Sequence, residues 1–194
     1  MDIKEIGVAL TGASGLIYGI RLIKYLRETG HRVVAVYTRR SVDVALHELG
    51  YNRDEYVGLL KSMANAVYCE DDFKSPLASS SSQPDALVIA PCSVKTLSGI
   101  VNGYAENIVI RSALAMLRLG RPLVLVPRET PISVVEAELL YKASLLGARI
   151  VPACPGFYHD PKSIDDLVDF IVGKILDVLG IKHSLYKKWG EERY

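Results

Sequence analysis

The chain of 194 residues has no excess of charge of either sign and no long apolar run. Lys and Arg number 23 against 22 Asp and Glu, which argues against a protein that holds nucleic acid by bulk charge. No stretch approaches the roughly 18 apolar residues of a membrane-spanning helix. The first residues lead directly into a strand-like run, unlike a secretory leader. We therefore expect a cytoplasmic protein that binds neither nucleic acid nor membrane.

Cysteine and histidine are too few and too widely spaced to build a disulfide framework or a metal site. The 3 cysteines (Cys69, Cys92 and Cys154) are an odd number without zinc spacing, which favours reduced thiols. The 4 histidines show no metal-ligand spacing either. We expect no bound metal, and we expect Cys92 to be a small apolar filler.

Hydrophobic residues make up 49% of the chain, enough for one domain with a sizeable core. A mean hydropathy of +0.19 also favours some apolar surface that other subunits cover. Short apolar runs alternate with helical spacing of apolar residues. Strands are expected at 6–10, 32–37, 66–68, 87–90, 123–126 and 148–151. Helices are expected at 16–26, 41–49, 54–65, 97–101, 107–119, 134–146 and 164–179.

This alternation predicts an α/β fold, a single domain with an open parallel sheet and helices on both faces. The strongest runs are apolar on successive residues, as in strands that are covered on both sides. We assign residues 1–180 to this domain and 181–194 to a C-terminal tail that completes the site or an interface.

A glycine-rich turn, Thr11-Gly12-Ala13-Ser14-Gly15, follows the first strand, and a helix opens just beyond it. Ligands of open parallel sheets bind at the carboxyl ends of the strands. Glycine lets the backbone approach a ligand, and a helix N-terminus offers N–H groups and positive potential to a phosphate. The turn therefore predicts a phosphate site, although a tight turn without a ligand has the same pattern.

The residues in and around the turn indicate which phosphate compound it would bind. It has neither the dinucleotide fingerprint nor a Walker A loop, but it comes close to the turn of short-chain dehydrogenases. Arg39-Arg40 could then hold the 2′-phosphate of NADP. The Tyr-x-x-x-Lys pair of those enzymes would be Tyr158 and Lys162, where Pro161 interrupts a helix. A mononucleotide such as FMN suits the turn better.

Polar and charged residues follow two further strands. Ser93 and Thr96 come after the strand at 87–90, where a serine is also a common helix cap. Arg128 and Glu129 come after the strand at 123–126, and a surface ion pair is the alternative interpretation. Because carboxyl ends of parallel strands share one sheet edge, we expect both groups to face the same ligand.

Two segments are irregular. Residues 71–84 hold a run of serines at 79–82, which indicates a surface loop or a loop over a phosphate. The tail after Gly180 carries Trp189, the only tryptophan of the chain.

Segments spread over nearly the whole chain together resemble the flavin prenyltransferases (UbiX-like proteins). These segments are 11–15, Cys92-Ser93, 122–129, 155–158 and 188–191. The resemblance implies a Rossmann-like flavoprotein that joins the dimethylallyl group of dimethylallyl phosphate to N5 and C6 of reduced FMN, without a metal. It implies a homo-oligomer, commonly a dodecamer, whose prenylated FMN serves a UbiD-type decarboxylase.

The resemblance also implies site residues. FMN would be held by Gly12, Ala13, Ser14, Thr38, Ser93, Val94, Lys95, Thr96 and Arg128. The donor phosphate would be held by Tyr158, Lys174, Arg111, Arg118 and Glu129. The catalytic group would be Glu48 as acid or base, with Ser14, Arg111, Arg118, Glu129 and Trp189, which walls the allyl group. The chain departs from the family at two positions, with arginine at 118 where lysine is frequent and lysine at 174 where arginine is frequent; a guanidinium fork and a point charge bind phosphate differently.

Two other functions compete with this interpretation. A flavin-dependent cysteine decarboxylase would share the fold, but its Pro-x-Met-Asn signature is replaced by Pro131-Ile-Ser-Val. A non-catalytic FMN carrier would bind flavin without needing Arg111, Glu129 or Tyr158.

Overall fold

The computed structural model of the chain describes residues 3–190, and within them six strands form one parallel sheet. The strands are β1 (Glu5–Leu10), β2 (Arg32–Tyr37), β3 (Ala66–Cys69), β4 (Ala86–Cys92), β5 (Leu123–Pro127) and β6 (Arg149–Ile150). Their order in the sheet is β3-β2-β1-β4-β5-β6, so the chain reverses its direction of winding between β1 and β4. This confirms the predicted open parallel sheet, and the reversal is where such sheets hold ligands.

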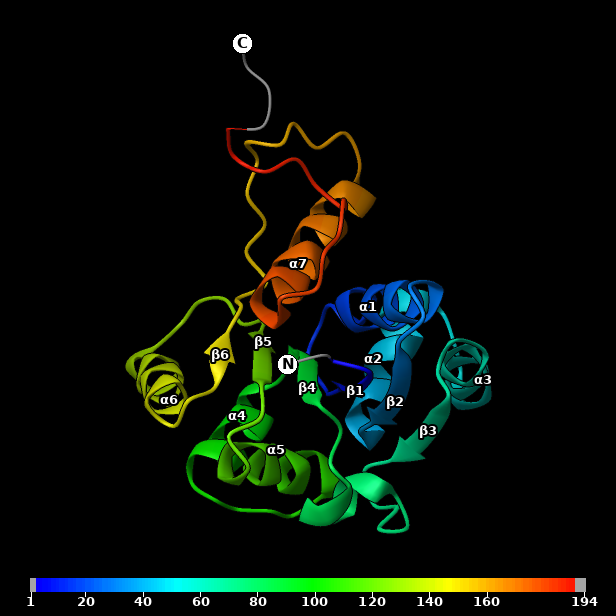
Figure 1. Cartoon of the computed structure of the whole chain (residues 1–194), viewed down its shortest axis with the longest axis vertical. Helices are drawn as coiled ribbons and strands as arrows, with labels where there is room; N and C mark the ends of the chain where they lie inside the picture. The colour runs from blue at the N-terminus through cyan, green and yellow to red at the C-terminus, as the bar shows by residue number, and fades with distance from the viewer. Residues whose placement is uncertain (1–2, 191–194) are drawn as a thin grey trace.

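Seven α-helices cover the two faces of the sheet within the described residues. They are α1 (Leu16–Glu28), α2 (Arg39–Leu49), α3 (Arg53–Met63), α4 (Val94–Val101), α5 (Ile108–Arg118), α6 (Val134–Leu145) and α7 (Ile164–Leu179). Figure 1 shows α1 and α7 over one face and α4 and α5 beneath the other. Each predicted helix is present, and α4 begins at Val94 because Ser93 caps its N-terminus.

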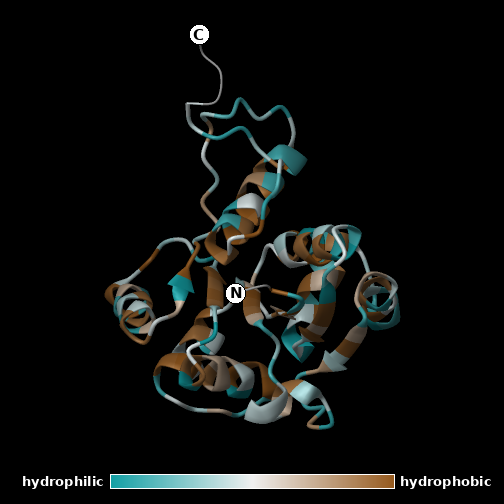
Figure 2. Ribbon diagram, in the orientation of Figure 1, coloured by the Kyte–Doolittle hydropathy of each residue, from teal (hydrophilic) through white to brown (hydrophobic). Residues whose placement is uncertain are grey.

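The core consists of two apolar layers, one on each face of the sheet. Buried residues of α1, α3 and α7 pack on one face, and those of α4, α5 and α6 pack on the other. All seven residues of β4 are buried, which agrees with the unbroken apolar run of this central strand. Figure 2 shows the central strands β4 and β5 in brown, the hydrophobic colour, while the far end of the molecule beyond α7 is largely teal.

A close contact fixes the first helix on the sheet. A Cβ atom on Gly19 of α1 would lie 2.2 Å from the carbonyl oxygen of Ala90 in β4. Only glycine therefore allows α1 to approach the end of β4 this closely. The contact places the turn between β1 and α1 next to the turn between β4 and α4.

The tail after α7 turns back along that helix toward its N-terminal end (Figure 1). There it meets the loop that joins β6 to α7, and the two segments project together from the body of the molecule. In residues 3–190, no helix is long and apolar enough to cross a membrane.

Candidate functional site

A cavity of about 330 Å³ opens where β1, β2, β4 and β5 end. Its walls come from the turns that follow these strands, from the end of β3 and from the start of α5. The lining residues are Gly12, Ala13, Ser14, Thr38, Arg40, Glu70, Ser93, Val94, Lys95, Thr96, Asn107, Arg128 and Glu129. The structure thus brings together all nine residues that the sequence interpretation assigned to FMN, at the predicted edge of the sheet.

Thr11 joins the first two turns of the cavity. Its hydroxyl donates to the carbonyl of Pro91 at 2.8 Å and accepts from the backbone N–H of Ser93 at 2.8 Å. Thr11 is buried, so both bonds are shielded from water. These bonds therefore tie the end of β1 to the end of β4.

The first turn of α4 forms one wall of the cavity. Ser93 caps the helix, accepting from the backbone N–H of Thr96 at 3.3 Å and donating to the Thr96 hydroxyl at 3.0 Å. The N–H groups of Val94 and Lys95 belong to the first turn, where a helix has no carbonyl to offer them. This turn can bind an anion through backbone N–H groups and hydroxyls.

The opposite wall is the start of α2. Thr38 caps this helix by accepting from the N–H of Ser41 at 3.2 Å. A Cβ atom on Gly12 would lie 2.4 Å from the Cβ of Arg40, so glycine is needed where the two turns meet.

Charged side chains rim the cavity. Arg128 donates from Nε to the carbonyl of Ser14 at 3.2 Å, which ties the end of β5 to the glycine-rich turn. Lys95 forms an ion pair with Glu106 at 2.7 Å, and hydrogen bonding to this carboxylate raises the pKa of Lys95. Both cations can face an anionic ligand.

Two lining residues were not expected from the sequence. The carboxylate of Glu70 accepts from the backbone N–H of Arg39 at 2.7 Å and from the amide of Asn107 at 2.7 Å. Glu70 follows β3, which the sequence predicted as a strand at 66–68, and a carboxylate at a strand end is the kind of signal that identified Glu129. Asn107 caps α5 and had only the pattern of an ordinary helix cap.

Glu48 lies beside the glycine-rich turn but does not line the cavity. Its carboxylate accepts from the N–H of Gly15 at 2.9 Å and from the N–H of Leu16 at 3.2 Å. The structure here differs from the sequence expectation, because these N–H groups of α1 hold a carboxylate of the chain instead of offering themselves to a phosphate. An anion at a helix N-terminus is stabilised by the same dipole that would attract a phosphate.

A second, smaller cavity of about 100 Å³ adjoins the first and shares Val94, Arg128 and Glu129 with it. Its other walls are mainly apolar and include Cys92, Leu97, Ile132 and Leu140. Cys92 is buried, and burial raises the pKa of its thiol to about 12, which keeps the thiol protonated and agrees with the predicted filler role. The pair of cavities can hold a polar ligand next to a small apolar group.

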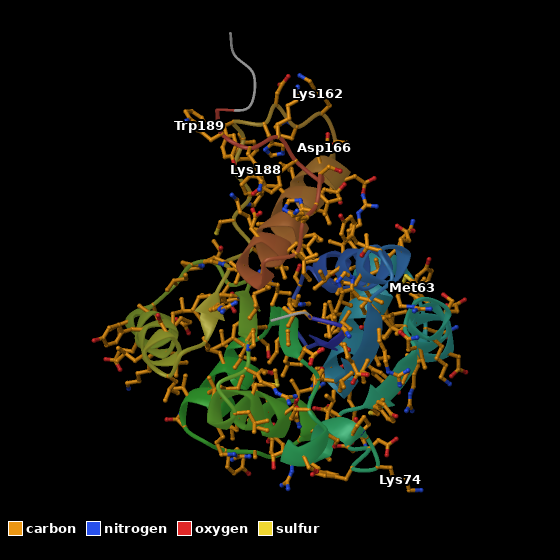
Figure 3. All side chains as sticks on the ribbon, viewed as in Figure 1. Met63, Lys74, Lys162, Asp166, Lys188 and Trp189 are labelled. Atoms are coloured by element: carbon orange, nitrogen blue, oxygen red, sulfur yellow. The ribbon has the colours of Figure 1, made fainter. Side chains whose placement is uncertain are left out.

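Tyr158, Lys174 and Trp189 form a separate cluster at the projecting end of the molecule and line neither cavity. The ring of Tyr158 packs edge-on against Trp189 with centroids 5.3 Å apart, and against Phe170 at 5.7 Å. Trp189 is 83% exposed. Figure 3 shows Trp189, Lys188, Lys162 and Asp166 at this end of the molecule. Tyr158 and Lys162 lie in a loop without helix, as the sequence predicted against the dehydrogenase interpretation.

Arg111 and Arg118 lie exposed on α5 and line neither cavity, so they are separate from the cavity residues and from the cluster of Tyr158, Lys174 and Trp189. Arg111 donates from Nε to the carbonyl of Ala78 at 2.5 Å and so holds the segment 71–84, which forms two short turns of 3₁₀ helix. No residue of that segment lines the cavity, so the structure favours a surface loop over a loop that covers the site. One copy of the described chain therefore presents the expected site residues in three places.

The donor set of the large cavity fits FMN. Hydroxyls, first-turn N–H groups and cations suit a phosphate, and a mononucleotide needs the volume that the two adjoining cavities offer. Within residues 3–190, no group of three or more His, Cys, Asp or Glu side chains is arranged to hold a metal ion.

Comparison with known proteins places these features in a family. The family model described as Flavoprotein matches residues 1–176. A relative named flavin prenyltransferase UbiX from Methanothermobacter thermautotrophicus is 48% identical over 187 residues, which cover 96% of this chain and 96% of the relative.

Solved structures agree with the sequence comparison. A crystal structure of AnUbiX (PadA1) in complex with FMN and dimethylallyl pyrophosphate has a TM-score of 0.91 and 31% identity, covering 99% of this chain and 100% of that one. A dodecameric FMN-dependent Ubix-like decarboxylase from Escherichia coli O157:H7 has a TM-score of 0.89 and 33% identity, covering 95% of this chain and 98% of that one. The likeness therefore extends over the segments that form the cavity and the projecting end of this chain.

Proposed function

The chain belongs to the flavoprotein family and, within it, to the flavin prenyltransferases, and on this basis we propose that it joins a dimethylallyl group to N5 and C6 of reduced FMN. The proposed donor is dimethylallyl phosphate. The observation that carries this proposal is the near full-length likeness to a flavin prenyltransferase, at 48% identity. The strand-end cavity supports it, because its polar lining suits a mononucleotide.

FMN is proposed to bind through the two turns that Thr11 joins. Ser93 and Thr96, with the N–H groups of Val94 and Lys95, face the phosphate at the start of α4. Thr38 and the turn Gly12–Ser14 face the rest of the mononucleotide, and Arg128 reaches it from the end of β5. When bound and reduced, FMN supplies the nucleophilic atoms that receive the prenyl group.

The donor is proposed to bind through Tyr158 and Lys174, helped by Arg111, Arg118 and Glu129. Cations lower the barrier to departure of an allylic phosphate because they stabilise its developing charge. The ring of Trp189 stabilises the cationic allyl fragment by cation–π attraction, on the order of 1–2 kcal/mol in a dry site. Glu48 or the released phosphate would take the proton that ring closure releases, and Ser14 would orient the reacting groups. These steps require no metal.

Several copies of the chain are proposed to complete each site. Arg111 and Arg118, the cavity and the cluster of Tyr158, Lys174 and Trp189 lie apart in one copy, and the phosphate-binding groups must converge on one donor. A homo-oligomer brings them together, and a dodecamer is the proposed state. Residues 1–180 supply the nucleotide-binding domain, and the tail 181–194 completes the site; residues 191–194 lie outside the described part of the chain.

The product is proposed to serve a separate UbiD-type decarboxylase as its cofactor. A cytoplasmic location, where such a partner would receive the product, stays a prediction. It can be tested by locating a tagged chain in fractionated cells.

The direct test is to incubate the purified protein with reduced FMN and dimethylallyl phosphate in the presence of a metal chelator. The expected result is a flavin whose mass grows by one dimethylallyl unit, with release of phosphate. An unchanged flavin mass with both the monophosphate and the diphosphate donor contradicts the proposal. A carrier would bind FMN and tolerate loss of Arg111, Glu129 and Tyr158, whereas the enzyme would lose prenyl transfer.

A further inference from the structure

The ammonium group of Lys174 lies among aromatic rings at the base of the tail. Its Nζ atom is 5.2 Å from the ring centroid of Phe170 and 4.7 Å from that of Tyr186. Burial lowers the pKa of Lys174, but hydrogen bonding to Tyr186 and Tyr158 outweighs burial and raises the pKa above its usual value. Lys174 is therefore a charged group that lies over the rings of Phe170 and Tyr186, where both tyrosines favour its protonated form.

Tyr186, which belongs to the tail, is itself fixed from α7. Its hydroxyl donates a short hydrogen bond to Oδ2 of Asp177. Burial raises the pKa of Tyr186, and the bond to Asp177 raises it further, so the hydroxyl keeps its proton. Because that proton is directed to Asp177, the lone pairs of the Tyr186 oxygen are available to accept from Lys174.

Asp177 has further partners in the tail. His183, whose side chain is 1% exposed, approaches Oδ1 of Asp177 with Nε2 at 3.1 Å. The backbone N–H of Leu185 donates to Nδ1 of His183 at 3.2 Å, which leaves Nε2 as the nitrogen that donates to Asp177. Burial raises the pKa of Asp177, but the bonds from Tyr186 and His183 outweigh burial and lower it. The carboxylate is therefore ionised and held at both oxygens.

A glycine makes this arrangement possible. A Cβ atom on Gly173 would lie 2.6 Å from two ring atoms of Tyr186 and 2.8 Å from Cε1 of His183. The absence of a side chain at Gly173 therefore lets the two tail rings pack closely on α7. The tail is fitted to the helix that carries both Lys174 and Asp177.

We propose that Asp177 and Tyr186 are positioning residues that order Lys174 for the phosphate of the prenyl donor. The inference rests on the proposed function, in which Lys174 binds that phosphate. A lysine side chain is a flexible stem with a point charge, whereas the arginine frequent at this position in the family carries a preorganised fork. An ammonium that Tyr186 already orders loses less conformational freedom when phosphate binds, which strengthens binding.

The test is the variant Tyr186→Phe, which keeps the buried ring and removes the hydroxyl. Calorimetry with the oxidised FMN complex, which cannot turn over, measures the Kd of dimethylallyl phosphate. We expect this Kd and the KM for the donor to rise on the order of tenfold, the size of one hydrogen bond to a charged group, with kcat and FMN affinity unchanged. Asp177→Asn should also raise the donor Kd and KM. Tyr25→Phe, which removes a partly buried hydroxyl on α1, is the matched control and should change neither constant.

A double-mutant cycle separates positioning from general support of the fold. Lys174→Met should weaken donor binding by itself, and adding Tyr186→Phe to it should weaken binding no further. Full additivity of the two effects, or an unchanged donor Kd in Tyr186→Phe, overturns the inference. If Tyr186→Phe fails to fold, the same cycle with Asp177→Asn decides in the same way.

Results that contradict the proposed reaction can be distinguished from results that contradict the positioning role. If the wild-type protein binds the donor and responds to these variants as expected but never prenylates flavin, the proposed reaction is wrong and the positioning role stands. If Lys174→Met leaves the donor Kd unchanged, Lys174 does not bind the donor, and the positioning role is overturned with that assignment.

Discussion

The strand-end cavity and the tail cluster are built in different ways. The cavity is made by turns that follow directly on buried strands, and hydrogen bonds of Thr11 and Ser93 join neighbouring turns. The tail cluster is the group of Tyr158, Lys174 and Trp189 at the projecting end, together with the rings of Phe170 and Tyr186. It is held by ring packing and by the hydrogen bond from Tyr186 to Asp177. One region is thus fixed by the parallel sheet, and the other by side chains that meet outside it.

Two crowded glycines show what this difference means. At Gly19, an added Cβ would meet the backbone oxygen of Ala90, which belongs to a central strand and cannot yield. At Gly173, an added Cβ would meet side-chain rings of the tail, which can swing away. The same substitution should therefore damage the whole domain at one site and release only the tail at the other.

The largest effect is expected for Gly19→Ala. The new methyl group would overlap the Ala90 oxygen, and such overpacking costs about 3 kcal/mol or more of unfolding free energy. Urea denaturation monitored by circular dichroism measures this loss. Gly58→Ala on α3 is the control, because nothing lies within 4 Å of its Cβ position. It should stabilise the chain by about 0.5–1 kcal/mol, as alanine is the better helix residue. Equal stability of the two variants would contradict the close packing of α1 on β4.

Gly173→Ala should separate the two regions. We expect the tail to leave α7 while the sheet keeps its stability and the cavity its FMN affinity. Donor affinity should fall on the order of tenfold, because Tyr186 no longer contacts Lys174. Trp189 is the only tryptophan, so a drop in its fluorescence anisotropy reports release of the tail. An unchanged anisotropy together with normal donor binding would show that the tail does not depend on this glycine.

Two serine caps provide a matched pair for the cavity. Ser93→Ala and Ser133→Ala each remove an N-cap, at α4 and α6 respectively, and each should cost about 1 kcal/mol of stability. Only Ser93 lines the cavity, so only its loss should weaken FMN binding, on the order of tenfold. Flavin fluorescence titration measures both variants, and equal FMN affinities would remove Ser93 from the proposed phosphate site.

The smallest effect is expected from acid. The pKa of Asp177 is lowered in the folded chain, so its ionised form stabilises tail docking above the unfolded pKa of about 3.9. This contribution disappears as the pH falls through the lower folded pKa. Trp189 anisotropy should therefore decrease in that acidic window, and the decrease should be smaller in Asp177→Asn. Identical acid profiles for the two proteins would exclude Asp177 as the group responsible.

Local sequence determined much of this protein. Unbroken apolar runs identified the buried strands, and the turn residues after them, such as Ser93 and Arg128, could be placed at one sheet edge because parallel strands end together. Cys92 was predicted to be a small apolar filler because the sequence offers it no histidine or basic partner, and the structure buries it at the end of β4. These features depend on neighbours in the chain and on the regular geometry of the sheet.

Only the tertiary structure decided which side chains that are distant in the sequence lie within hydrogen-bonding or packing distance of each other. Glu48 holds the start of α1 across a separation of 33 residues, and Glu70 reaches Asn107 across 37. The hydrogen bond from Tyr186 to Asp177 requires the tail to turn back over Gly173. The periodicity of the sequence does not predict this turn. A sequence pattern records the spacing along the chain, whereas hydrogen bonds and ring packing depend on distances in space that are set only when the helices close on the sheet.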